Sequence, residues 1–262
     1  MTFYLDLMGY LSSVSLLARV FVLGLVPFLL TCLGVVPVVF LGRSVEEKWL
    51  DLGLGFSAGV MLVASFTSLL LPAVGVAGVW VVVVGFVVGV VVVRLLDVVV
   101  PHMHVFKGYE GPRPPRAVRR AWLLVFAMMI HNIPEGMAVG AAAIYSVHAG
   151  LSLAIAIGVQ DIPEGLAVAM PLYASTHDKK KSVALGVLSG FLELLAAMIP
   201  LLVVTLVNYA LPILMSLAAG AMVYVVVHEI TPEIYGHSHD DQSTAGFIIG
   251  FITTLILETI LG

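Results

Sequence analysis

Long apolar runs dominate this sequence and limit the folds open to it. Each is long enough to cross a hydrocarbon core of ~30 Å as a helix. Only 11% of the 262 residues are charged, whereas an ordinary soluble domain has about 25%. The chain is therefore predicted to be an all-α polytopic membrane protein with eight transmembrane helices, forming one transmembrane domain over residues 1–262. The predicted spans are approximately 20–41, 52–71, 76–98, 121–145, 150–173, 183–207, 211–229 and 244–261.

Two stretches need separate treatment. The valine-rich run 81–93 would suggest a strand in a soluble protein, but inside a bilayer a helix is favoured because it satisfies its own backbone hydrogen bonds. Residues 1–19 lack the basic start and small-residue cleavage site of a signal peptide. An interfacial helix and a short additional span both fit them. The single cysteine, Cys32, excludes a disulfide within the chain and a thiolate-cage metal site.

The basic residues predict the orientation in the membrane. Connections 1–2, 3–4 and 5–6, with the adjoining helix ends, hold every Lys and Arg of the chain except Arg19. By the positive-inside rule these connections are cytoplasmic, as is 7–8, and both termini are external. The stretch 99–120 is a basic cytoplasmic loop. The run Lys179–Lys181 is explained by topogenesis, so no nucleic-acid partner is expected. The lack of targeting segments favours a prokaryotic plasma membrane.

A short polar motif occurs twice inside these apolar runs. HNIPEG begins at His131, and QDIPEG begins 29 residues later at Gln160. Residues three and four apart share a face of a helix. Each copy therefore presents one polar face, consisting of His131, Asn132 and Glu135 in the first copy and Gln160, Asp161 and Glu164 in the second.

The proline and glycine next to each glutamate change the backbone around a possible metal-binding site. Pro134 and Pro163 remove a backbone donor, which kinks the helix and frees a carbonyl near residues 130 and 159. Gly136 and Gly165 allow close approach of a neighbouring helix. Only about four residues separate the fourth and fifth spans, so the two are expected to be antiparallel neighbours whose polar faces meet.

Three polar residues converge on one depth. His131, Gln160 and Glu193 each lie about ten residues from the start of their predicted span. At ~1.5 Å per residue each reaches about 15 Å into the bilayer, close to its midplane. The fourth, fifth and sixth spans are therefore expected to bring their polar residues together.

The buried charges indicate what the polar residues of these three spans bind. A charged group at a helix centre costs about 2.5–3.5 kcal/mol on insertion scales. Four acids lie near this depth without a Lys or Arg: Glu135, Asp161, Glu164 and Glu193. Imidazole, carboxylate and carboxamide ligands suit Zn²⁺, Fe²⁺, Mn²⁺, Co²⁺ or Cd²⁺, and the two glutamate faces could hold two adjacent ions. The alternative is a satisfied polar cluster that only aids helix packing.

HNIPEG, with Pro163-Glu164-Gly165 on the next span, resembles the signature of the ZIP (Zrt-/Irt-like protein) family of divalent metal transporters, and is most similar to prokaryotic GufA-like members. The resemblance implies inverted repeats of spans 1–3 and 6–8 flanking the metal-binding spans 4 and 5. It also implies import toward the cytoplasm, often as a homodimer, with elevator-like sliding. One metal site would then comprise His131, Glu135, Gln160 and Glu164. The adjacent site would comprise Asn132, Glu135, Asp161, Glu164 and Glu193. Many members have His where this chain has Gln160, which leaves the metal preference open.

Further polar residues are candidates along the ion's route. His228 and Glu229 are predicted to close the seventh span at its cytoplasmic end, and Asp97 closes the third. Together with His102 and His104 they are candidate exit-path ligands. Glu258, near the external end of the eighth span, is a candidate for the entrance. In the 7–8 connection, His237 and His239 precede Asp240 and Asp241, which fits either a metal-capturing patch or a solvated loop.

The predicted function is transport of a divalent transition metal, Zn²⁺ first and also Cd²⁺, Fe²⁺ or Mn²⁺, with the metal as substrate and no organic cofactor. An intramembrane metalloenzyme is disfavoured, because no His-Glu-x-x-His motif occurs. A pump is excluded by the lack of a nucleotide-binding loop. A proton-coupled carrier for an organic solute would use the acids but leaves the imidazole and carboxamides unexplained. Small-residue faces such as Gly53–Gly59 fit packing within a protomer or between two.

Overall fold

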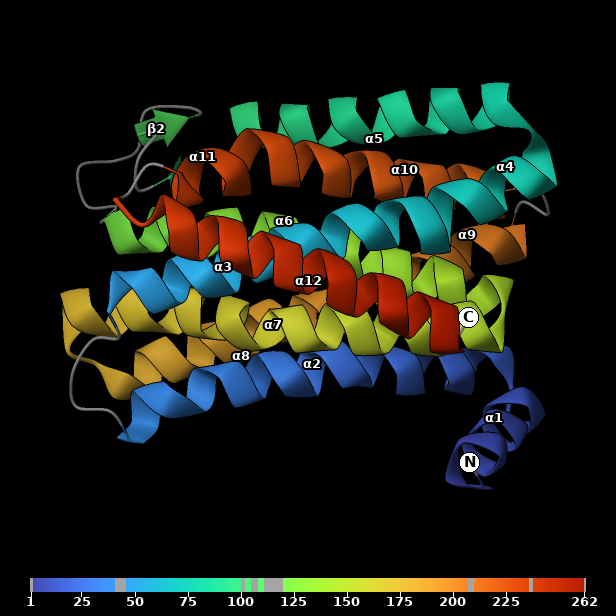
Figure 1. Cartoon of the computed structure of the whole chain (residues 1–262), viewed down its shortest axis with the longest axis horizontal. Coiled ribbons are helices and arrows are strands. Elements are labelled where there is room, and N and C mark those ends of the chain that lie inside the picture. Colours follow the sequence, from blue (N-terminus) through green and yellow to red (C-terminus); the bar gives the residue numbers. More distant parts are fainter. Residues whose placement is uncertain are drawn as a thin grey trace.

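The chain folds into an elongated bundle of long helices, with the N- and C-termini at the same end (Figure 1). The computed structural model describes residues 2–40, 46–99, 102–104, 108–110, 120–206, 210–235 and 238–261. In the N-terminal half the elements are α1 (Thr2–Ser13), α2 (Leu16–Phe40), α3 (Glu47–Ala64), the π-helical turn η1 (Ser65–Leu70), α4 (Leu71–Ala77), α5 (Val79–Val99), β1 (His102–His104) and β2 (Gly108–Glu110). They continue with α6 (Arg120–Tyr145), α7 (Val147–Thr176), α8 (Lys179–Ala197), α9 (Ile199–Leu206), α10 (Leu211–Val225), the π-helical turn η2 (Val226–Ile230), α11 (Thr231–Ile234) and α12 (Asp240–Leu261).

The helices confirm a polytopic helical membrane protein. Within the described residues, seven helices are long and apolar enough to cross a bilayer: Leu16–Phe40, Glu47–Ala77, Val79–Leu96, Val147–Met170, Lys179–Thr205, Leu211–Ile234 and Asp240–Ile260. The 26-residue helix α6, which carries HNIPEG, is not one of these seven. The count of eight spans therefore stays a prediction.

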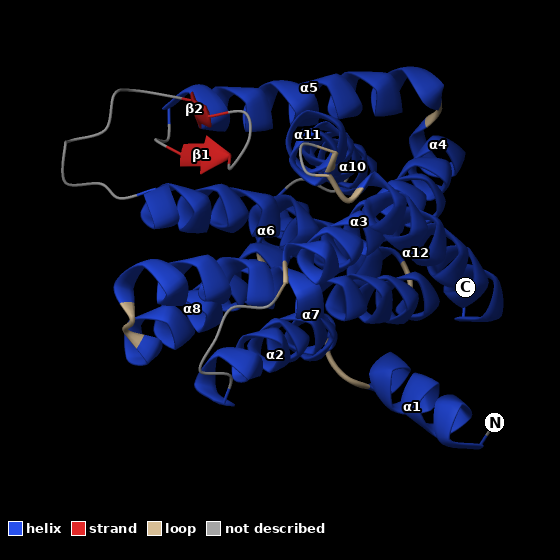
Figure 2. Ribbon diagram, turned by 60° about the vertical axis from the view of Figure 1, so that its left-hand side comes forward, coloured by secondary structure: helices blue, strands red, loops and turns tan. Residues whose placement is uncertain are grey.

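Besides the helices, the described residues include one short hairpin. Strands β1 and β2 pair antiparallel, with Met103 opposite Tyr109, inside the predicted basic loop. Figure 2 shows this hairpin between the ends of α5 and α6. It is short and lies outside the helices that carry the polar motifs.

Helix α1 bears on the two interpretations of residues 1–19. It has 12 residues, which makes it about 18 Å long, well short of a ~30 Å hydrocarbon core. Its Met8 and Leu11 are nevertheless buried, and the Arg19 side chain donates a hydrogen bond to the Leu11 carbonyl over 3.0 Å. This length favours an interfacial helix.

Two π-helical turns interrupt the long helices, and each stands directly before a proline. Turn η1 precedes Pro72, and η2 precedes Pro232. Proline cannot donate to the carbonyl four residues earlier, and the wider π turn carries the helix past it. The seventh span therefore continues to Ile234. The prediction that His228 and Glu229 close this span was wrong, because both lie inside a continuous helix.

Close backbone contacts at glycines join the helices in pairs. A Cβ atom on Gly136 of α6 would lie 2.1 Å from the Glu193 carbonyl oxygen of α8, and one on Gly165 of α7 would lie 2.4 Å from the Thr31 oxygen of α2. The predicted close approach at both glycines is confirmed. Equivalent contacts join α3 to α12 at Gly59 and α5 to α10 at Gly89. We call α2, α6, α7 and α8 the inner group, and α3, α5, α10 and α12 the outer group.

The same contacts answer the question left by the small-residue face of α3. A Cβ on Gly55 would lie 2.3 Å from the Ser243 oxygen, and one on Gly59 would lie 2.2 Å from the Phe247 oxygen, both on α12. At Gly53 the neighbour is the Pro163 side chain of α7. This face is therefore packed within the protomer.

Candidate metal centre

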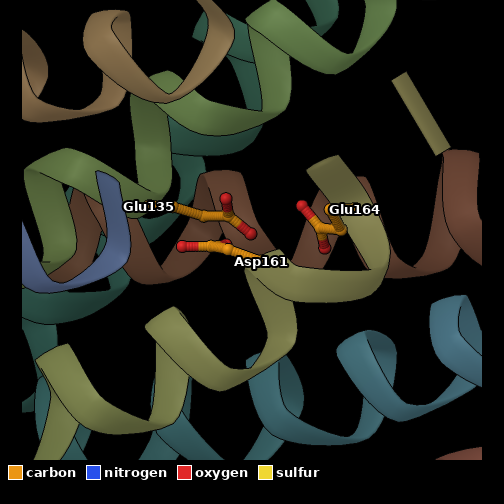
Figure 3. A group of neighbouring side chains, drawn as sticks. All are labelled: Glu135, Asp161 and Glu164. Atoms are coloured by element: carbon orange, nitrogen blue, oxygen red, sulfur yellow. The ribbon is translucent and has the colours of Figure 1, made fainter. Parts of the chain in front are cut away.

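Three carboxylates meet in the interior of the bundle. Glu135 of α6 and Asp161 and Glu164 of α7 each place a ligand oxygen within 4.8 Å of the others. Their exposed fractions are 0%, 2% and 4%. Figure 3 shows the three side chains converging from the two helices. The two copies of the motif thus face each other, as their spacing predicted.

Amide and imidazole groups surround this cluster. Gln160 donates from Nε2 to the Glu135 Oε1 over 2.5 Å, which joins the two copies of the motif directly. Asn132 donates from Nδ2 to the Ser189 hydroxyl of α8 over 3.1 Å. Glu193 of α8 is fully buried. The seven residues predicted as metal ligands are all buried: His131, Asn132, Glu135, Gln160, Asp161, Glu164 and Glu193.

Several buried oxygen atoms of this cluster lack a hydrogen-bond partner among the described residues. They are Oε2 of Glu135, Oε1 of Gln160, Oδ2 of Asp161, Oε1 of Glu164 and both carboxylate oxygens of Glu193. An ionised carboxylate and an amide oxygen can only accept, and a buried acceptor left unsatisfied costs about 1–3 kcal/mol. A cation bound among them would satisfy these oxygens, so the residues fit a metal.

The charge balance points the same way. No Lys or Arg of the described chain is buried, whereas Glu135, Asp161, Glu164, Glu193 and Glu229 all are. Carboxylates this close repel one another when ionised. Cations or protons must therefore compensate the cluster. A cluster that served packing alone would carry its counter-charge among its own side chains.

His131 makes a contact that its spacing did not predict. Its Nε2 is hydrogen-bonded to the Glu229 carboxylate of η2. The side chains of the two residues are 5% and 1% exposed. Glu229 was predicted at a helix end but lies in the interior, because η2 and α11 extend the helix beyond it. Its neighbour His228 stacks on Tyr224, with 4.7 Å between ring centroids.

The remaining candidates lie away from the cluster. The half-buried Glu258 of α12 accepts a hydrogen bond from the Ser68 hydroxyl of η1. Asp97 lies in the last turn of α5, and His102 and His104 lie in β1, but their side chains fall outside the described residues, as does His237. His239 is not free in a loop: its Nδ1 lies 2.9 Å from Oδ2 of the buried Asp51 on α3.

Sequence reasoning missed several buried polar residues that hydrogen-bond to the candidates, and three of them follow. Ser57 of α3 donates to the backbone carbonyl of Gln160 over 3.2 Å, Ser189 bonds Asn132, and Asp51 bonds His239. The signal for Ser57 and Ser189 was a hydroxyl among glycines and alanines on a helix, which is too common to single them out. Asp51 lies one position before the predicted span 52–71, so the argument from depth in the bilayer did not reach it.

Fold and site together define a class: a polytopic helical membrane protein with a buried, acidic, ligand-rich centre, which is the plan of an ion carrier. The sequence model of the ZIP zinc transporter family matches residues 107–258. The chain is 40% identical over 252 residues to zinc transporter ZIPB of Bordetella bronchiseptica, covering 91% of this chain and 80% of that protein. It is 37% identical to zinc transporter GufA of Myxococcus xanthus (68% and 70% covered), and 31% identical to zinc transporter ZIP11 of Homo sapiens (86% and 92% covered).

The chain therefore belongs to the ZIP family. The resemblance inferred from HNIPEG and its partner motif is confirmed, including the similarity to GufA. Because this is a family of transporters, the prediction that the chain is not an enzyme is also confirmed.

Proposed function

We propose that this protein carries divalent transition metal ions, Zn²⁺ first, across the plasma membrane through the centre formed by α6, α7 and α8. The observation that carries the proposal is the set of buried carboxylate and amide oxygens without partners around Glu135, Asp161 and Glu164. The names of the relatives, all zinc transporters, support Zn²⁺ as the first substrate to test. Cd²⁺, Fe²⁺ and Mn²⁺ are further candidates, since they share these ligand types.

The proposed centre holds two adjacent ions. One would bind His131, Glu135, Gln160 and Glu164, and the other Asn132, Glu135, Asp161, Glu164 and Glu193. Support comes from Glu135 and Glu164, whose ligand oxygens lie within 4.8 Å of each other and whose two carboxylate oxygens each could serve both ions. Ligands must shed their protons before metal binds, so affinity is expected to fall as the pH is lowered.

The proposed movement is a slide of the inner group along the outer group. Support comes from the contacts between helices. At several glycines a Cβ atom would lie within 2.4 Å of a carbonyl oxygen of another helix, and these close contacts pair α2 with α7, α6 with α8, α3 with α12 and α5 with α10. Both helices of each pair belong to the same group. Helices packed this closely move as one body, because separating them opens a well-packed interface. Between the groups, Gly53 meets a side chain of α7 instead.

Direction, symmetry and assembly complete the proposal. Import runs toward the end of the bundle that carries Lys179–Lys181, with both termini external. Spans 1–3 and 6–8 form inverted repeats; the α3–α12 and α5–α10 pairs are the kind of matched contact that such repeats produce. Asp97, His102, His104, His228 and Glu229 stay the proposed exit-path residues on the basis of the sequence, Glu258 the proposed entrance residue, and the proposed assembly is a homodimer.

Metal flux into proteoliposomes tests this function. The purified protein is reconstituted around a metal-sensitive dye, and Zn²⁺, Cd²⁺, Mn²⁺ and Fe²⁺ are added in turn. Glu164→Ala removes a central ligand and is expected to abolish saturable flux. Glu46→Ala removes a carboxylate that is 69% exposed and serves as the matched control. Normal flux in Glu164→Ala would refute the proposed centre.

A further inference from the structure

The His131–Glu229 hydrogen bond joins the two helix groups at the metal centre. His131 stands on α6 of the inner group, and Glu229 on η2, within the continuous α10–α11 helix of the outer group. Both side chains are buried. Any slide of one group along the other must therefore break this bond or carry it out of register.

The geometry of the ring assigns different tasks to its two nitrogens. A metal-binding histidine commonly coordinates through one nitrogen and donates its other N–H to a carboxylate, which fixes the tautomer and the ring orientation. Since Nε2 of His131 faces Glu229, coordination by this residue falls to Nδ1. His131 also lies one helical turn before Glu135, a member of the acidic cluster, and so shares its face of α6. The ring thus bonds Glu229 of the facing helix and stands on the same face of α6 as a cluster carboxylate.

The π turn explains why Glu229 reaches this position. Turn η2 shifts the helical register by one residue before Pro232, and such turns occur often at functional sites. Within it Val227 is 63% exposed, toward the surrounding lipid, whereas Glu229 is 1% exposed. The turn therefore holds the Glu229 carboxylate against His131, although Val227 of the same turn is exposed.

We propose that Glu229 positions His131 for metal binding, so that the centre binds metal tightly only where the inner and outer groups lie as they do here. Sliding of the inner group removes Glu229 from Nε2, releases the ring and lowers the affinity, which favours discharge of the ion. The inference rests on the proposed transport function. It gives the two positions of the carrier different affinities, which is what couples binding to movement.

Metal affinity of the purified protein tests this role, with Zn²⁺ as the probe in competition with a chelating dye at fixed pH. Glu229→Ala is expected to weaken Zn²⁺ binding about 10- to 100-fold, the usual effect of losing such a partner. Glu229→Gln keeps an acceptor for the Nε2 proton and should stay within about threefold of wild type, since orientation survives. Glu233→Ala, one turn further along the same helix, is the matched control and should leave the affinity unchanged.

A double-mutant cycle separates positioning from direct ligation. A residue that acts only through His131 has no effect once His131 is gone, so Glu229→Ala should add no further loss to His131→Ala. Additive losses would overturn the inference, because they would make Glu229 an independent ligand. A loss in Glu229→Gln as large as in Glu229→Ala would overturn it too. If Glu229→Ala does not fold, Glu229→Asp retains the charge but withdraws the acceptor by one methylene, and wild-type affinity there would refute the inference.

X-ray absorption of the bound Zn²⁺ supplies a readout that a purely structural residue would not change. The imidazole signal attributable to His131, measured against His131→Ala, should be present in wild type and Glu229→Gln and lost in Glu229→Ala. A signal undiminished in Glu229→Ala would overturn the inference. Wild-type protein that neither binds nor transports metal would instead refute the proposed function itself.

Discussion

Replacing Gly136 by alanine should separate the two helices that carry the proposed ligands. The added Cβ would lie 2.1 Å from the Glu193 carbonyl oxygen, whereas ordinary contact begins at 3.4 Å. The backbone of α8 must therefore withdraw by about 1.3 Å, the difference between these distances. Glu135 is the adjacent residue on α6 and Glu193 is itself the residue displaced, so the opening falls directly between two proposed ligands.

The expected loss follows from that displacement. Metal–ligand distances hold within about 0.2 Å, so a shift of this size removes Glu193 from a shared ion. We expect Zn²⁺ affinity to fall at least about tenfold, equal to ~1.4 kcal/mol, and thermal stability to fall by the ~1–3 kcal/mol typical of overpacking. Dye competition measures the first and thermal unfolding in detergent the second.

Gly75→Ala is the matched control, because a Cβ there meets nothing within 4 Å. In helix α4 it should leave metal affinity unchanged and stabilise the helix by up to ~1 kcal/mol, since alanine is the better helix former. Wild-type affinity and flux in Gly136→Ala would refute the reasoning that close packing of α6 on α8 sets the geometry of the centre.

Three further predictions test selectivity, topology and packing. Gln160→His should raise Zn²⁺ and Cd²⁺ flux several-fold relative to Mn²⁺, because imidazole suits the former and an amide oxygen the latter; an unchanged ranking in the dye assay would place selectivity elsewhere. In a Cys32→Ala background, Lys180→Cys should react with an impermeant thiol reagent from the cytoplasmic side only, and labelling from outside would overturn the orientation. His239→Ala should lower thermal stability by about 1–3 kcal/mol more than Asp51→Ala does. The reason is that His239→Ala removes a hydrogen-bond partner from the Asp51 carboxylate, which is 2% exposed, whereas Asp51→Ala removes one from the His239 imidazole, which is 31% exposed. Equal melting temperatures of the two variants would contradict this.

The candidate centre was predictable from sequence because its signals are local. The i,i+3 and i,i+4 spacing of His131, Asn132 and Glu135 places them on one face wherever that helix lies. The short connection to α7 then forces the second motif to face the first, and the observed clustering of Glu135, Asp161 and Glu164 confirms it. Glu193 was predicted in the same way, because the number of residues from the start of a spanning helix gives the depth of a residue in the bilayer.

The errors arose where the outcome depends on distant residues. The seventh span is predicted to end at Glu229 because the polar stretch 231–243 follows, yet a π turn carries the helix past Pro232 to Ile234. The strands β1 and β2 have only three residues each, too few for an alternation of polar and apolar residues to identify them. Neither feature follows from helical spacing or apolar composition.

The sequence by itself determined the class of protein, its long apolar helices and the residues of the candidate metal centre. These follow from hydrophobicity, helical period and motif, each of which acts over neighbouring residues. Only the tertiary structure decided that His131 meets Glu229 from a helix 98 positions further along the chain. It alone decided that Ser57 bonds the Gln160 carbonyl, and which helices pair through close glycine contacts. Those facts depend on which helix packs against which, and many pairings of similar apolar helices satisfy the same local rules.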